Sequence, residues 1–246
     1  MSEHAASDVS PSDRRRAELA GNLERVRERI AAACTAAGRD PDQVTLTVVT
    51  KFFPASDVRL LAELGVRDLG ENRHQEAQAK AADCADLKLR WHFIGHLQSN
   101  KAGAVARYAD VVESVDRTSL VTRLSRGAHD SDRVVDCLVQ VDLDPDTDAH
   151  AGRSGAAPAD VVPLAERLVA ADGLRLRGVM AVAPLGADPA PAFASLMRVS
   201  DQVRGVDPAA TWVSAGMSGD LEAAVAAGAT HVRIGSAILG PRPVLG

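Results

Sequence analysis

The sequence predicts a single parallel (β/α)8 barrel, an α/β fold of the TIM type, with one extra helix at its N-terminus. Eight short apolar runs alternate with stretches of helical periodicity, which is typical of a parallel sheet. The length of 246 residues suits one barrel of this kind. A doubly wound open sheet is the alternative, but no G-x-G-x-x-G follows the first apolar run, where that fold holds a dinucleotide. We expect residues 1–11 to form a disordered tail and residues 12–246 to form the barrel.

The individual elements follow from local patterns. Ser10 and Pro11 predict the start of a first helix that ends near Ala37, because Leu19, Leu23 and Val26 are spaced for one buried face. Strands are expected where β-branched and apolar residues cluster, and helices where the apolar spacing becomes three or four residues. The predicted strands are 44–50, 66–69, 91–94, 111–115, 134–141, 174–182, 211–214 and 231–234, and the predicted helices between them are 55–64, 73–83, 98–107, 117–128, 158–171, 188–204 and 219–227.

Composition excludes several classes of protein. A net charge of -5 argues against a general nucleic-acid binder, so we interpret the arginines of the first helix as a solvated face. Three widely spaced cysteines form neither a disulfide framework nor a zinc motif, which favours a reducing compartment. The first residues lack the apolar segment of a signal peptide, and no stretch is long enough to span a membrane. We expect a cytoplasmic monomer without nucleic-acid or membrane partners.

A lysine, Lys51, follows the first predicted strand. In a parallel barrel, side chains at the carboxyl ends of the strands face the active-site mouth. Partial burial there weakens the preference of a lysine for its ammonium form and leaves an amine that can attack a carbonyl. Lys51 is therefore a candidate for covalent bonding to an aldehyde or ketone. The alternative is a loop lysine whose stem covers apolar surface.

Two glycine- and serine-containing loops follow the seventh and eighth predicted strands. The first contains Gly216 and Ser218, and the second contains Gly235 and Ser236. Barrels often bind phosphate with these two loops, through free backbone amides at a helix start. Such residues also cap helices for purely structural reasons. The presence of two such loops after these two strands predicts a phosphate site. It would lie beside Lys51, because strand eight pairs with strand one when the barrel closes.

A reactive amine next to a phosphate site suggests a phosphorylated aldehyde. The candidates are pyridoxal 5′-phosphate (PLP) and the sugar-phosphate substrate of a Schiff-base lyase. Arg233, on the eighth predicted strand, favours PLP if it reaches the pyridine nitrogen, where a permanent cation disfavours ring protonation. Its structural alternative is an ion pair with a carboxylate inside the barrel. Asn72, after the second predicted strand, either contacts a ligand or caps the next helix.

Metal binding is not predicted. His92 and His96 are four residues apart, but they fall on a strand and its loop and lack a companion acidic motif for zinc. Alternating aspartates after residue 142 resemble a calcium loop, yet Thr147 and Arg153 occupy the positions that need glycine and glutamate. We interpret residues 142–155 as a solvated acidic loop.

The motifs together resemble those of the YggS-type pyridoxal phosphate homeostasis proteins, a family similar to the N-terminal barrel of alanine racemase. The resemblance extends from about residue 20 to Arg242 and rests on VVTK at 48–51, LGENR at 69–73, HFIGHLQSNK at 92–101, SAGMS at 214–218 and VRIGSAI at 232–238. It implies a fold-type III barrel that holds the vitamin B6 cofactor PLP as a Schiff base on Lys51. Phosphate contacts are then implied for Ser218, Gly235 and Ser236, with Met217 alongside, Arg233 facing the pyridine nitrogen and Asn72 lining the pocket.

The resemblance also implies a function. These proteins are carriers or regulators of intracellular PLP that affect amino-acid and keto-acid balance, without clear catalytic activity, and PLP-dependent apo-enzymes are their expected recipients. The alternative is an amino-acid racemase or related PLP enzyme. The related racemase takes its second base, a tyrosine, from a C-terminal β domain that we expect to be missing here, and Tyr108 falls at the end of a predicted helix, away from the strand ends. Phe53 departs from the family pattern, which often has a polar or basic residue there.

Overall fold

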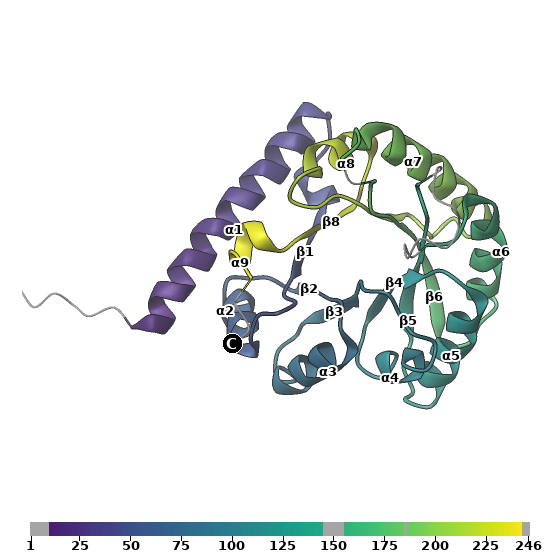
Figure 1. Ribbon diagram of the computed structural model, residues 1–246, viewed down its shortest axis with the longest axis horizontal. Coiled ribbons are helices and arrows are strands. Elements are labelled where there is room, and N and C mark those ends of the chain that lie inside the picture. The colour runs from purple at the N-terminus through teal and green to yellow at the C-terminus, as the bar shows by residue number, and fades with distance from the viewer. Residues whose placement is uncertain (1–9, 145–154, 185, 243–246) are drawn as a thin grey trace, which may run out of the picture.

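The computed structural model is a closed barrel of eight parallel strands, each paired with its sequence neighbours, and β1 pairs with β8 (Figure 1). It describes residues 10–144, 155–184 and 186–242. The strands are β1 Thr45–Val49, β2 Asp68–Glu71, β3 Arg90–Phe93, β4 Val111–Val115, β5 Val135–Gln140, β6 Leu174–Met180, β7 Trp212–Ser214 and β8 His231–Ile234. The helices are α1 Pro11–Ala36, α2 Ala55–Glu63, α3 His74–Asp83, α4 Ala102–Val105, α5 Thr118–His129, α6 Pro158–Val169, α7 Pro189–Val206, α8 Leu221–Ala227 and α9 Ser236–Leu239, with a 3₁₀ turn η1 at Pro41–Gln43.

The predicted fold class is confirmed, and each of the eight strands overlaps the segment expected for it. Two element predictions need correction. Strand β2 lies two residues later than expected and ends in Glu71, a carboxylate that can be buried because Lys80 and Thr50 bond to it. Helix α4 has only four residues where ten were expected, because the flanking segments form tight turns, with Lys101 N–H bonded to the Gln98 carbonyl and Arg107 N–H to that of Ala104.

Apolar side chains fill the layer between the strands and the surrounding helices. On β1 and β8 the side chains alternate, so that Val48 and Ile234 pack outward under α1, α2 and α8 while Thr47 and Arg233 point into the barrel. A small apolar cluster of Val111, Leu138 and Met180 is separate from this outer layer. The remaining interior is occupied largely by polar and charged groups.

Helix α1 lies outside the ring of helices, along α8, α9 and α2 (Figure 1). Its start is as predicted: the Ser10 side chain accepts a hydrogen bond from Asp13 N–H, and Pro11 is the first helical residue. Leu19, Leu23 and Val26 are buried against the barrel. The expectation of a solvated arginine face is only partly correct, because Arg15 and Arg29 form ion pairs with Asp57 and Glu222 on the barrel. None of the helices in the described part of the chain could span a membrane.

Candidate functional site

The carboxyl ends of β1 and β8 open into one cavity of about 220 Å³. Six of the seven residues predicted as the site line this cavity: Lys51, Met217, Ser218, Arg233, Gly235 and Ser236. The pairing of β1 with β8 explains this arrangement, because it brings residue 51 beside residues 233–236. Its volume is below the roughly 300–1,000 Å³ of drug-sized ligand sites, which suits a small ligand.

Lys51 is held by an unusual turn. The residue after it, Phe52, has a φ of 73°, a left-handed conformation that is uncommon for a bulky side chain and clusters at functional sites. Its N–H donates to the Glu76 carboxylate. The Lys51 side chain is half-buried, and this burial lowers its pKa, together with the positive charges of Arg242 and Arg73. A larger fraction of Lys51 is therefore present as the free amine, which is the nucleophilic form.

A buried ionic group supports this turn from outside the barrel wall. The Lys80 ammonium donates to the carboxylates of Glu71 and Glu76 and to the Thr50 carbonyl, each at 2.7 Å. The Thr50 hydroxyl also donates to Glu71, at 2.6 Å. We call these four residues the Lys80 cluster. It fixes the backbone on both sides of Lys51, through Thr50 before it and through the contact of Glu76 with Phe52 after it.

The two predicted phosphate loops are shaped by glycine and by α1. Gly216 has a φ of 93°, and a Cβ there would lie 2.6 Å from the Ala224 side chain, so only glycine fits. Asn22 of α1 donates to the Ile238 carbonyl at 2.7 Å, which anchors α9 and thereby Ser236. Arg29 donates to the Ser218 carbonyl at 3.2 Å. The extra helix therefore holds both loops from outside.

Arg233 is buried at the wall of the cavity, and a chain of buried polar groups inside the barrel holds its guanidinium. Its guanidinium donates to the Ser214 hydroxyl at 2.6 Å and to the Ala181 carbonyl at 2.8 Å. Ser214 donates to Glu113 at 2.6 Å, and Glu113 bonds to His92 at 2.7 Å. The carboxylate of Glu113 lies 3.8 Å from Arg233, so the ion pair inside the barrel is present, and Arg233 also lines the cavity. Its contact with a pyridine nitrogen stays a prediction.

His92 extends this chain to Asp68, at 3.0 Å. We call Asp68, His92, Glu113, Ser214 and Arg233 the Glu113 cluster. Its members come from β2, β3, β4, β7 and β8, so the chain of contacts crosses the barrel interior. Burial opposes protonation of His92, but the two carboxylates outweigh it and raise its pKa to about 9. His92 is thus a structural cation, and no metal-binding group of side chains occurs among the described residues.

Asn72 is placed differently from the other predicted residues. It lines a neighbouring depression with Arg73, His74 and Lys101 rather than the Lys51 cavity. Its Oδ1 atom is buried and has no hydrogen-bond partner. Such an unpaired acceptor is costly, which leaves Asn72 as a candidate for contacting a bound group at the edge of the cavity.

Sequence reasoning missed Phe52 and Arg242 as cavity residues. The Phe52 ring lies 4.9 Å from the guanidinium carbons of Arg73 and Arg242 and 6.0 Å from Lys51 Nζ. No local pattern signals a positive φ at a phenylalanine, so this arrangement could not be predicted. Phe53 lines the cavity and is buried in the apolar layer, so the additional positive charges near Lys51 come from Arg73 and Arg242.

Tyr108 and the predicted acidic loop lie away from the Lys51 cavity or outside the described residues. Tyr108 does not line the Lys51 cavity; its hydroxyl lies 3.5 Å from His74 Nδ1 at the start of α3, nearer to the strand ends than expected, and burial raises its pKa. Most of the loop 142–155 lies outside the described residues, as does most of the predicted tail.

Comparisons with known proteins agree with this geometry. The family described as "Alanine racemase, N-terminal domain" matches residues 21–243. The pyridoxal phosphate homeostasis protein of Mycobacterium tuberculosis is 42% identical over 96% of this chain and 98% of that protein. The structure of PipY from Synechococcus elongatus with PLP bound has a TM-score of 0.78 at 35% identity, covering 90% of this chain and 100% of that one. The crystal structure of an unknown protein from Bifidobacterium adolescentis has a TM-score of 0.83 at 32% identity, covering 96% of this chain and 100% of that one.

Proposed function

The chain belongs to the alanine racemase N-terminal domain family, and within it to the pyridoxal phosphate homeostasis proteins; from this premise we propose that it binds PLP through Lys51 and takes part in PLP homeostasis. The observation that carries the proposal is the half-buried Lys51 in one cavity with both loops that follow β7 and β8. We further propose that it acts in the cytoplasm as a monomer and passes PLP to apo-enzymes.

The residues of the cavity fit this cofactor. When bound, PLP supplies an aldehyde carbon that a free amine can attack. Lys51 offers the amine, and burial lowers its pKa, which increases the fraction of the nucleophilic free amine. Ser218 and Ser236 offer hydroxyl groups, and Gly235 lets the backbone approach closely, as phosphate recognition requires. Met217 offers apolar contact beside them.

Arg233 is the group that would act on the ring of the cofactor in this proposal. It is a buried permanent cation, and Ser214 and Ala181 fix its direction. Directed at a pyridine nitrogen, it disfavours ring protonation and so weakens the ring as an electron sink. Such an arrangement favours holding PLP over using it for carbanion chemistry.

The test begins with the visible absorption spectrum of the purified protein. We expect an absorption band that disappears after borohydride treatment. Peptide mass spectrometry should then find the phosphopyridoxyl mass on Lys51 and not on Lys80, Lys88 or Lys101, the other lysines of the sequence. Lys51→Ala should abolish the adduct, whereas the exposed Lys88→Ala should not. A colourless protein that takes up no added PLP would overturn the proposal.

The enzyme alternative is tested separately. A racemase needs a second proton-transferring group opposite the lysine, and Tyr108 does not line this cavity. We therefore expect no uptake of solvent deuterium at Cα of alanine or serine by the PLP-loaded protein beyond that of Lys51→Ala. Deuterium uptake well above this background would identify the protein as a PLP enzyme.

A further inference from the structure

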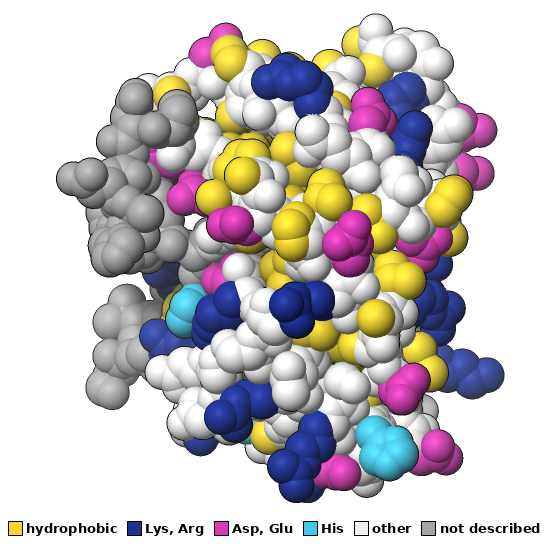
Figure 2. Space-filling view, turned by 90° about the vertical axis from the view of Figure 1, so that its right-hand side faces the viewer, with side chains coloured by type: hydrophobic (Ala, Val, Ile, Leu, Met, Phe, Trp, Pro, Cys, Tyr) yellow, Lys and Arg dark blue, Asp and Glu magenta, His cyan; other side chains and the backbone are white. Residues whose placement is uncertain are grey.

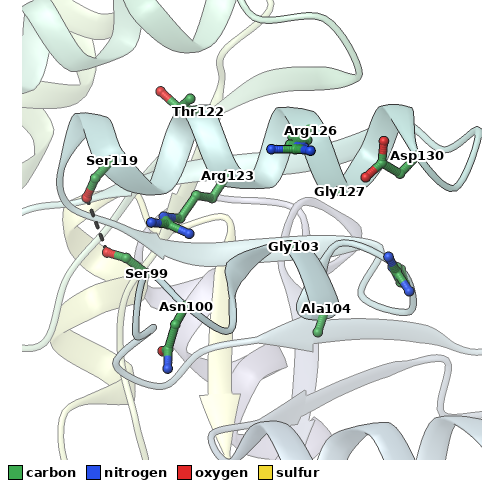
Figure 3. A pocket seen from close by; sticks show the side chains of 11 residues that line it. Ser99, Asn100, Gly103, Ala104, Ser119, Thr122, Arg123, Arg126, Gly127 and Asp130 are labelled. Carbon is green, nitrogen blue, oxygen red and sulfur yellow. Dashed lines mark hydrogen bonds between the residues drawn. The ribbon is translucent and has the colours of Figure 1, made fainter.

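A groove of about 790 Å³ runs between α4 and α5, on the outside of the barrel (Figure 3). It exists because α4 has only four residues and leaves one side of α5 uncovered. Two backbones are in direct contact at its floor, because a Cβ at Gly127 would lie 2.5 Å from the Gly103 carbonyl oxygen.

Three arginines of this groove have no side-chain partner among the described residues. Arg107, Arg123 and Arg126 are exposed, and none of them makes a side-chain hydrogen bond or ion pair with another described residue. Elsewhere the surface arginines are commonly neutralised, for example Arg29 by Glu222 and Arg59 by Asp86.

The groove also carries little negative charge of its own. Asp130 is the one carboxylate in its described lining, and it forms no ion pair with Arg126 within that part of the chain, although the two are four residues apart on α5. In the space-filling view, basic side chains gather in the lower half of the face formed by α5, α6 and α7 (Figure 2). This is a local excess of positive charge on a chain whose net charge is -5.

Neutral polar groups occupy the other end of the groove. Arg123 and Arg126 extend from α5, while Ser99 and Asn100 come from the loop that precedes α4 (Figure 3). The hydroxyls of Ser99 and Ser119 lie 3.2 Å apart and connect this loop to α5. Hydroxyl and amide groups can both donate to and accept from peptide groups, which suits an extended polypeptide.

We propose that this groove docks an acidic segment of a partner protein, whose carboxylates pair with Arg107, Arg123 and Arg126. Guanidinium groups bind carboxylates in a bidentate geometry and form the recognition sites for acidic motifs in other proteins. The groove is open and most of its lining residues carry polar or charged side chains, whereas the sites of small molecules are concave and lined mainly by apolar side chains. No aromatic side chain lines it for base stacking in its described part, which disfavours RNA.

The site is independent of the Lys51 cavity, because the two share no lining residue. The test measures fluorescence anisotropy of a labelled peptide of alternating glutamate and glycine, added to the PLP-loaded protein at low ionic strength. A peptide with glutamine in place of glutamate is the matched neutral probe. We expect binding of the acidic peptide only, and we expect it to weaken as salt rises.

Charge-reversal variants assign the binding to the groove. The double variant Arg123→Glu and Arg126→Glu should weaken binding by at least about tenfold. A control with the same charge change, Arg167→Glu and Arg198→Glu on α6 and α7, should bind almost as well as the unmodified chain. All four residues are exposed, so folding and the PLP absorption band should be unaffected.

Several outcomes would overturn the proposal. They are absence of binding by the unmodified protein, equal losses in the two double variants, and equal binding of the glutamine peptide. Tighter binding of a single-stranded RNA or of inorganic phosphate at the same arginines would assign the groove to another ligand. Failure of PLP to bind, by contrast, would leave the peptide result intact and would count only against the proposed function.

Discussion

The Lys80 cluster and the Glu113 cluster both bury a glutamate beside the cavity, yet they shift its pKa in opposite directions. Burial raises the pKa of Glu71, and the charge and hydrogen bond of Lys80 only partly offset this effect. Burial would also raise the pKa of Glu113, but His92, Arg233 and Ser214 outweigh it and lower the value to about 2. The difference lies in the charge balance of the two clusters.

In the Lys80 cluster, two carboxylates share one ammonium group. In the Glu113 cluster, the carboxylates of Asp68 and Glu113 are matched by Arg233 and a protonated His92. Two cations for two anions leave no uncompensated buried charge, which is the condition under which a buried ion pair is tolerated. The incompletely neutralised cluster fixes the backbone around Lys51, whereas the balanced one fixes a side chain, Arg233.

The largest expected effect is on stability. Glu113→Ala should lower the free energy of unfolding by about 3–5 kcal/mol, because it leaves Arg233 and His92 buried without a carboxylate between them. Glu71→Ala should cost less, about 1–3 kcal/mol, because that carboxylate is already poorly compensated. Urea unfolding of both variants measures the two costs, and an equal or larger cost for Glu71→Ala would contradict the comparison.

The pH dependence of stability should be next in size. His92 binds a proton in the folded state up to a pKa of about 9, whereas an unfolded histidine releases it near 6.5. Its contribution is complete below pH 6.5 and is lost as the pH rises through about 9, so the free energy of unfolding should fall by on the order of 2–3 kcal/mol over this window.

His92→Gln should flatten this dependence in urea titrations at several pH values. His231 does not add to this slope. Burial lowers its pKa to about 4, so its contribution to the free energy of unfolding changes only below pH 6.5. A slope between pH 6.5 and 9 that is the same in both proteins would show that His92 is neutral when folded.

Lys80→Met should cost about 2 kcal/mol, since it removes three hydrogen bonds from one ammonium and leaves two carboxylates without a cation. The more specific expectation concerns Lys51. With Thr50 and Glu76 released, the yield of borohydride-trapped PLP at a fixed time should fall severalfold. The exposed Lys88→Met is the matched control. An unchanged yield in Lys80→Met would show that the Lys80 cluster does not support the reaction of Lys51 with PLP.

The smallest expected effect is that of Ser214→Ala. It removes the hydroxyl between Arg233 and Glu113 and should cost about 1 kcal/mol, while the Ala181 carbonyl still holds the guanidinium. The yield of PLP adduct should be unchanged, but the position of the absorption maximum should shift, because the cation near the ring is less well fixed. A loss of adduct instead would mean that the Glu113 cluster also affects Lys51, and not Arg233 alone.

Much of the fold and part of the site could be predicted from local patterns. Apolar periodicity located all eight strands, since strands buried on both sides read as continuous apolar runs. Lys51, Ser218 and Ser236 were identifiable because barrel closure brings the ends of strands one, seven and eight to one mouth. The length of α4 was not predictable, because the turns on both sides of it and the contact between Gly103 and Gly127 decide it, and the sequence displays neither.

The sequence by itself determined the barrel, its order of strands and the lysine at its mouth, because these depend on periodicity and on position along the chain. Only the tertiary structure decided which charges are buried together. Glu113 and Ser214 are 101 residues apart, and their contact across the barrel exists only once the sheet has closed. The charge state of His92 and the direction of Arg233 follow from such distant contacts, since an electrostatic environment depends on neighbours in space.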